Sequence, residues 1–133
     1  MHNFETMTAD LKKLGAIIDA PSSLLSGWGI PKEDGTPYIE IGDDVYLYLS
    51  SERGYQIFKK EVSNYDELLY LIFSNITHKM AVNYELRNRN SEEDCRRTIF
   101  SKQLELLGTV KAEWRCKREK EIEAILRNAP FED

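Results

Sequence analysis

Few residues in this 133-residue chain are suited to acid–base chemistry. His78 is the one internal histidine, and with a nearby carboxylate it would serve as a general base of a small hydrolase. Helical spacing places His78 beside Lys79 on the outer side of its predicted helix, so a solvent-exposed or interface histidine is the simpler interpretation. The sequence has no glycine-rich phosphate loop, no GxSxG motif and no HExxH motif.

Neighbouring carboxylates occur at Asp43-Asp44 and again over residues 92–94. Catalysis by a carboxylate pair requires two groups that face each other across a pocket and have well-separated pKa values. Residues adjacent in a turn or in the first turn of a helix do not meet that requirement. The group at 92–94 is explained by the helix dipole. Asp43-Asp44 is interpreted either as a simple turn or as a contact for a binding partner.

The cysteines and histidines do not indicate a metal or cofactor. Cys95 and Cys116 are far apart and form no CxxC motif, which predicts reduced thiols within helices. The two histidines, His2 and His78, are not clustered with them. A dedicated zinc site is therefore not expected, and no cofactor is expected either.

Length and composition indicate one ordinary globular domain over residues 1–133. The chain is 41% hydrophobic and 31% charged, and its length suits a single domain. No apolar run approaches the roughly 18 residues that a membrane span needs. The first 15 residues contain no hydrophobic signal core. These features predict a cytoplasmic protein that does not contact a membrane.

Charge is distributed unevenly along the chain. Residues 1–67 carry 12 acidic and 6 basic side chains, whereas residues 68–133 carry 11 acidic and 12 basic ones. The basic residues of the second half alternate with acidic ones, as in the helical pair Glu113 and Lys117, so a solvated, self-paired face explains them. An acidic first half is poorly suited to nucleic acid and well suited to a basic partner.

The pattern of apolar residues predicts an α+β fold. Helical spacing near the start gives a short helix, which a loop with Trp28 as its hydrophobic anchor follows; together they occupy residues 1–37. Alternating residues with turn signals over 38–62 predict a small three-stranded antiparallel sheet. Three helices are predicted over 64–128 and are expected to pack on the sheet.

The helix predicted over residues 64–89 raises a question of its own. Its apolar stripe continues, at 100° per residue, onto Asn83 and Arg87. A buried arginine must be paired, because an unpaired buried charge destabilises a fold by several kcal/mol. We expect these two residues either to make intramolecular contacts that fix the corner into the next helix or to contact a partner.

Several short stretches together resemble the immunity protein 63 family of bacterial polymorphic toxin systems. The stretches are SERG, DELLYLIF, YELRNR, FSKQLELLG, EW, EIEAIL and PFED, in this order between about Tyr38 and the end of the chain. The chain departs from the family pattern at Val45–Tyr48, which lacks a glycine and a histidine, and at Lys59-Lys60-Glu61. The class of toxin is therefore not carried over.

The resemblance implies a cytoplasmic protein, without catalysis or cofactor, that binds the C-terminal domain of a toxin. We expect a monomer that neutralises its toxin by direct stoichiometric binding, with a basic toxin domain as partner. A small regulatory protein that binds another basic protein is the alternative. Acidic loops beside a sheet suit such an interface, and aromatic residues often anchor one. The predicted interface residues are Asp34, Glu40, Asp43, Asp44, Tyr46, Tyr48 and Glu52.

Overall fold

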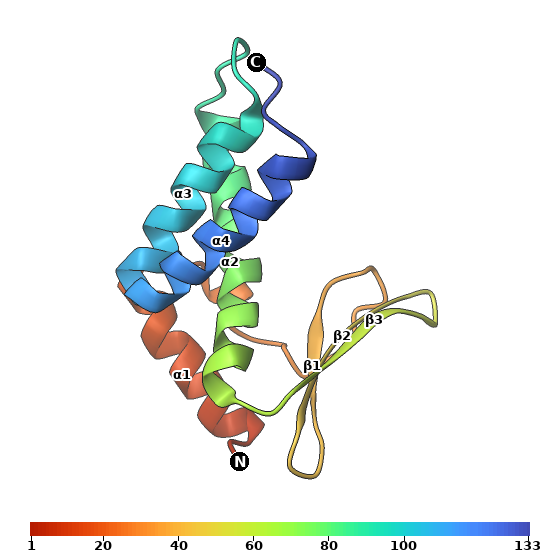
Figure 1. Ribbon diagram of the computed structural model, residues 1–133. Helices are drawn as coiled ribbons and strands as arrows, with labels where there is room; N and C mark the ends of the chain where they lie inside the picture. The colour runs from red at the N-terminus through yellow and green to blue at the C-terminus, as the bar shows by residue number, and fades with distance from the viewer. The chain divides into compact units, whose positions relative to one another are not determined.

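The structure, a computed structural model, describes residues 1–133 and contains four α-helices and one three-stranded sheet (Figure 1). This confirms the predicted α+β class and the order of the elements. In chain order the elements are α1 (Phe4–Ile17), the short 3-10 helix η1 (Ser22–Leu24), β1 (Tyr38–Ile41), β2 (Tyr46–Glu52), β3 (Tyr55–Val62), α2 (Tyr65–Arg87), α3 (Cys95–Val110) and α4 (Ala112–Asn128).

The chain divides into two compact units, Met1–Leu71 and Ile72–Asp133, and the division falls inside α2. The first unit holds α1, the sheet and the first turns of α2. The second unit holds the rest of α2 with α3 and α4. A single domain over residues 1–133 stays a prediction.

Helix α1 begins with a capping box. The Asn3 side chain accepts a hydrogen bond from the Thr6 N–H at 2.9 Å, and the Thr6 hydroxyl accepts one from the Asn3 N–H at 3.1 Å. Met7 and Leu11, one turn apart, are buried. A Cβ atom at Gly15 would lie only 2.6 Å from the ends of the Leu25 side chain, so the glycine makes room for Leu25 where the following loop crosses the helix.

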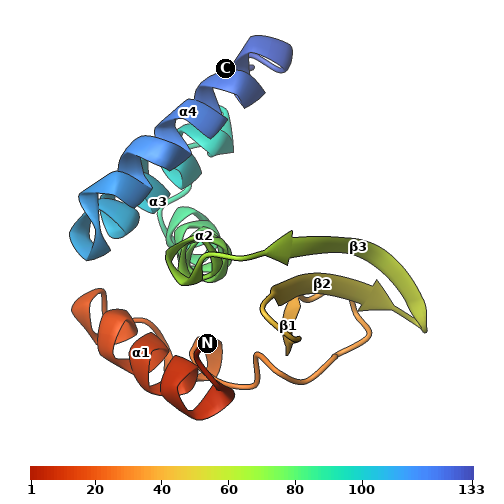
Figure 2. The ribbon, with the colours of Figure 1, turned by 60° about the horizontal axis from the view of Figure 1, so that its bottom comes forward.

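The sheet is antiparallel in the order β1-β2-β3, with β2 between its neighbours (Figure 2). Arg53 and Gly54 both have positive φ, 50° and 83°, as a two-residue type I′ turn requires. This turn joins β2 to β3 directly, in agreement with the predicted SERG turn. Strand β3 has an extra residue, because Ser50 pairs with Phe58 while Ser51 pairs with Gln56.

A loop covers the β1 side of the sheet. The Ile39 N–H donates to the Trp28 carbonyl at 2.7 Å, and the Gly35 N–H donates to the Ser51 carbonyl at 2.9 Å. The Ser50 hydroxyl donates to the Gly35 carbonyl at 2.6 Å. Trp28 is 8% exposed, which confirms its predicted role as an anchor. The outer edge of β1 is therefore occupied by the chain itself.

Residue types alone predict Ser91 as the cap of the helix that becomes α3 and Gly108 as its end, and the structure differs at both positions. Asp94, not Ser91, caps α3, because its side chain accepts a hydrogen bond from the Arg96 N–H. Gly108, expected to end this helix, lies inside it. A Cβ atom there would lie 3.0 Å from the Arg115 side chain, so Gly108 permits the close approach of α3 and α4.

Asn83 and Arg87 are exposed, so neither lies on the buried face of α2, and contact of these two residues with a partner stays a prediction. The charged residue that is buried there is Glu85, at 3% exposed, and it pairs with Arg89 one turn later at 3.0 Å. Ala81, four residues before Glu85, is also fully buried. The buried residues of this half of α2 are thus four positions apart, and the face of the helix that they form does not include Asn83.

A buried polar network joins the three helices of the second unit. Gln103 of α3 is 1% exposed and donates to the Ser74 carbonyl of α2 at 2.9 Å. Its side-chain oxygen accepts a hydrogen bond from Arg118 of α4 at 3.0 Å. Arg118 also donates to Glu121 at 3.0 Å. Each polar group thus has a partner, which fixes how the helices face one another.

Replacing Gln103 with alanine is expected to lower the free energy of unfolding by about 1–3 kcal/mol, because Arg118 loses one of its two acceptors and the buried amide no longer bonds to the Ser74 carbonyl. Urea denaturation followed by circular dichroism measures this change. Glu105→Ala on the exposed side of the same helix removes only a surface pair with Lys102 and should change it by less than about 1 kcal/mol. Equal effects of the two variants would contradict the role of the network.

Residues 129–133, here called the C-terminal segment, are held against the start of α3. Arg96 donates to two carbonyl oxygens of the segment, both at 2.8 Å. Arg97 pairs with Asp133 at 2.7 Å, and its guanidinium carbon lies 4.1 Å from the centre of the Phe131 ring. The stretch PFED is thus explained by contacts within the second unit.

These contacts predict an acid-sensitive element. Hydrogen bonds from Arg96 and from the Glu132 N–H hold the pKa of Asp94 well below its usual range, and Arg97 lowers the pKa of Asp133. A folded-state pKa below the unfolded value means that the stabilisation is present above about pH 4 and is lost as the pH falls through the folded-state pKa. Asp133→Asn should therefore lower the melting temperature at neutral pH, and the difference from the parent should shrink in acid. A difference that stays constant on acidification, measured by calorimetry, would argue against this ion pair.

Candidate protein-binding surface

The acidic residues of the predicted interface are all exposed, but the structure places them at opposite ends of the sheet (Figure 1). Glu40, Asp43 and Asp44 lie at the end where β1 turns into β2. Asp34 and Glu52 form an isolated bridge at the other end, beside the turn into β3. The seven residues of β2 separate the two ends by roughly 20 Å. The sequence therefore predicted one acidic surface where the structure has two.

The first acidic group is extended by Glu61, a residue that the sequence analysis did not include. Leu47 of β2 pairs with Glu40 on one side and with Glu61 on the other, so the three residues form a row across one face of the sheet. Neighbouring strands are about 4.8 Å apart, so the two carboxylates flank Leu47 at roughly 10 Å from each other. Together with Asp43 and Asp44 they form what we call the turn-end surface. The strand register alone brings Glu61 there.

The part of the turn-end surface on β1, β2 and the turn between them carries no positive charge, whereas on β3 Lys59 lies two residues from Glu61 on the same face. No lysine or arginine occurs between Lys32 and Arg53, which spans both strands that carry most of the surface. Asp44 has φ 61°, a conformation that aspartate tolerates better than most residues, and the Gly42 N–H donates to the Val45 carbonyl at 2.9 Å. The turn thus presents both aspartates outside the strands, where they are available to a partner.

The acidic residues of the opposite end serve partly to hold the loop onto the hairpin. Asp34 accepts a hydrogen bond from the Thr36 N–H at 2.9 Å, and bonding to Thr36 lowers the pKa of this carboxyl. Glu33, with φ 56°, accepts hydrogen bonds from the Arg53 and Gly54 N–H groups. Arg53 brings a positive charge to the same place. This end therefore has a structural role and a smaller net charge.

Tyr46 and Tyr48 are buried, which corrects their predicted role as exposed aromatic anchors. Tyr46 is 2% exposed, and its hydroxyl accepts a hydrogen bond from the His2 N–H at 2.8 Å. Tyr48 is 8% exposed, lies 5.6 Å from the Phe58 ring, and has its pKa raised to about 12 by burial. The physical reason is that both side chains lie on the face of β2 that Ile39 and Val62 share, and this face packs into the core of the first unit. Within the sheet, the large apolar side chains that are exposed belong instead to β3, namely Tyr55, Ile57 and Phe58.

His78 does not form the arrangement of a general base. Its side chain is exposed overall. Partial desolvation by the surrounding protein nevertheless lowers its pKa, and the positive charge of Arg118 lowers the pKa further. A general base of the kind considered above needs a carboxylate to orient it and stabilise its charged form. The positive charge of Arg118 instead destabilises the charged form of His78. The neighbour of His78 thus favours the non-catalytic interpretation.

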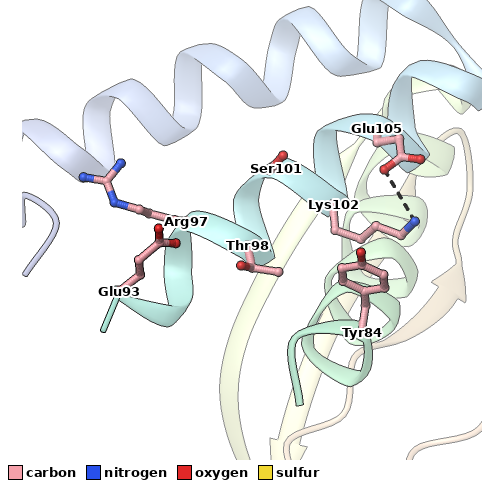
Figure 3. A pocket seen from close by; sticks show the side chains of 7 residues that line it. All are labelled: Tyr84, Glu93, Arg97, Thr98, Ser101, Lys102 and Glu105. Carbon is pink, nitrogen blue, oxygen red and sulfur yellow. Dashed lines mark hydrogen bonds and ion pairs between the residues drawn. The ribbon is translucent and has the colours of Figure 1, made fainter. Parts of the chain in front are cut away.

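A hollow of the second unit, with a volume of about 310 Å³, lies between the end of α2 and α3 (Figure 3). Its Lys102 ammonium lies 4.6 Å from the centre of the Tyr84 ring and 3.4 Å from the Glu105 carboxylate. Arg97, at its other end, pairs with Asp133. The cations that line the hollow are therefore engaged with neighbours in the protein.

Cys95 and Cys116 are free cysteines, and both are exposed on their helices. No helix has both the length and the apolar character that crossing a membrane requires.

The fold and these surfaces describe a small α+β protein whose notable feature is an acidic, exposed sheet end. The model of one protein family, described as Immunity protein 63, matches residues 42–124, which is more than half of the chain. The chain belongs to the immunity protein 63 family, as the resemblance in the sequence predicted. No curated protein and no solved structure matches it.

Proposed function

We propose that this protein neutralises a cognate bacterial toxin by binding the toxin's C-terminal domain directly, one to one, in the cytoplasm of the producing cell. Membership of an immunity protein family supports a protective function in general. Inhibition by binding needs an exposed complementary surface and no catalytic group. The chain acts as a monomer, without a cofactor and without binding nucleic acid or a membrane.

The observation that carries the proposal is the turn-end surface, where Glu40 and Glu61 flank Leu47 and the adjoining turn exposes Asp43 and Asp44. A toxin domain that acts on nucleic acid needs a basic surface, and an acidic surface complements it. Charge complementarity also accelerates encounter, which matters for a protein that must capture a lethal molecule early. Asp34 and Glu52 belong to the proposed interface at its periphery.

Co-expression tests the proposal. The toxin domain encoded beside this chain's gene is expressed in a susceptible host with and without the protein, and survival is scored. The proposal expects survival only with the protein, and a 1:1 complex with the purified, catalytically inactivated toxin domain in light scattering. Protection without a complex would contradict inhibition by binding. Neither protection nor binding would favour a regulatory role toward another basic protein.

A further inference from the structure

The two edges of the sheet differ in whether another part of the chain bonds to them. The outer edge of β1 is occupied by the preceding loop, through the hydrogen bond from Ile39 to Trp28. Strand β3 pairs only with β2, and the first seven of its eight residues are exposed. The chain therefore bonds to the edge at β1, whereas the edge at β3 is exposed from Tyr55 to Glu61.

The strand register identifies which backbone groups face outward on the open edge. Because the Ser51 carbonyl bonds to Gly35 on the far side of β2, its pair with Gln56 is not hydrogen-bonded, and the backbone of Gln56 points away from β2. Because the Ile39 N–H points away from β2, Tyr48, its partner, directs its backbone toward Lys60 of β3.

Hydrogen-bonded and non-hydrogen-bonded pairs alternate along the two strands, and this alternation identifies the other outward-facing backbone groups of β3. The pairs on either side of Tyr48–Lys60 are Leu49–Lys59 and Leu47–Glu61, and neither is hydrogen-bonded. The N–H and carbonyl groups of Lys59 and Glu61 therefore face outward, as those of Gln56 do. These three residues form a ready template for another strand.

We propose that the free edge of β3 takes up an extended segment of the toxin as a fourth strand. This inference rests on the proposed function and names the way in which the partner is bound. An added strand extends the row Glu40–Leu47–Glu61 by one residue, which then lies directly beside Glu61. A lysine or arginine of the toxin fits that position, since opposite charges across strands attract each other.

The same edge carries features that restrict which strand can pair. The bulge at Ile57 and the adjacent lysines, Lys59 and Lys60, are typical devices against unspecific edge pairing. The alternation of Lys59 and Glu61 selects a segment with an acidic residue beside the first and a basic residue beside the second. Tyr55, 79% exposed, and Ile57, 54% exposed, add apolar contact near the turn. The preferred occupant is thus a toxin segment of matching charge.

Amide hydrogen exchange tests the inference. In the free protein the amides of Gln56, Lys59 and Glu61 should exchange rapidly, whereas those of Lys60 and Val62 are already bonded to β2. Binding of the inactivated toxin domain should slow exchange at the first three by about tenfold or more, with a much smaller change at the other two. Glu61→Lys should weaken binding by about tenfold. Glu5→Lys, an exposed charge reversal on α1, should leave binding unchanged.

The possible results separate the two proposals. A complex in which these three amides stay unprotected overturns strand addition and leaves toxin binding intact. Absence of any complex overturns the proposed function. Protection of the same amides in the protein alone at high concentration, with a doubled mass, identifies a second copy as the occupant and also overturns the inference.

Discussion

Replacing Trp114 with alanine will lower the free energy of unfolding by about 3–5 kcal/mol, which is the usual range for a buried tryptophan. The side chain is 3% exposed at the start of α4, and its ring centre lies 5.7 Å from that of Phe73 of α2. Truncation removes this stacked contact and leaves a cavity in the core of the second unit. Urea denaturation with a far-ultraviolet circular dichroism signal measures the loss.

Ile125→Ala on the same helix is the matched control. Ile125 is 37% exposed, so its truncation should change stability by less than about 1 kcal/mol. A Trp114→Ala variant that melts at the parent temperature would show that the ring is exposed in solution. Trp114 would then have to be considered as an interface residue.

The elements of the fold could be predicted because local signals determine them. Gly54 after Arg53 predicts a tight turn, and the alternation that follows predicts the strand from Tyr55 to Val62 that the structure contains. Asn64 precedes α2 and accepts a hydrogen bond from the Glu67 N–H, as its residue type suggested. Signals of this kind act over a few residues and need no knowledge of the rest of the chain.

The errors in the core have a different cause, because they depend on which helices meet. An ideal projection of α2 carries its apolar stripe onto Arg87. In the structure Thr77, Ala81 and Glu85 are buried instead, on the side where Gln103 of α3 bonds to Thr77 and Ser74. Nothing in the sequence of α2 alone states where α3 will pack.

The prediction of the candidate site was limited in the same way, because it too depends on which elements meet. Acidic composition correctly indicated exposed carboxylates in the first half of the chain. The register of β3, which neither composition nor spacing fixes, places Glu61 in a row with Glu40. The exposure of Tyr46 was misjudged because alternation shows that a strand has two faces and does not show which of them packs against the core.

Converting Asp43 to lysine and Asp44 to asparagine in one variant should slow association with the toxin domain by about tenfold and flatten its dependence on salt. The change adds three units of positive charge to the turn-end surface, and long-range attraction determines mainly the association rate. Asparagine is chosen at position 44 because Asp44 has φ 61°, a conformation that asparagine tolerates. Both side chains are exposed, so the melting temperature should stay near that of the parent.

Reversal of Glu119 and Glu123 to lysine in α4 is the matched control, because it also changes two acidic residues of this chain. Glu119 pairs with Arg115 at 2.9 Å, so its charge is already compensated locally. This variant should associate at nearly the parent rate. Stopped-flow association at several salt concentrations, together with survival in co-expression, compares the two. If the turn variant binds and protects like the parent while the α4 variant fails, the toxin binds to the helices of the second unit and not to the turn-end surface.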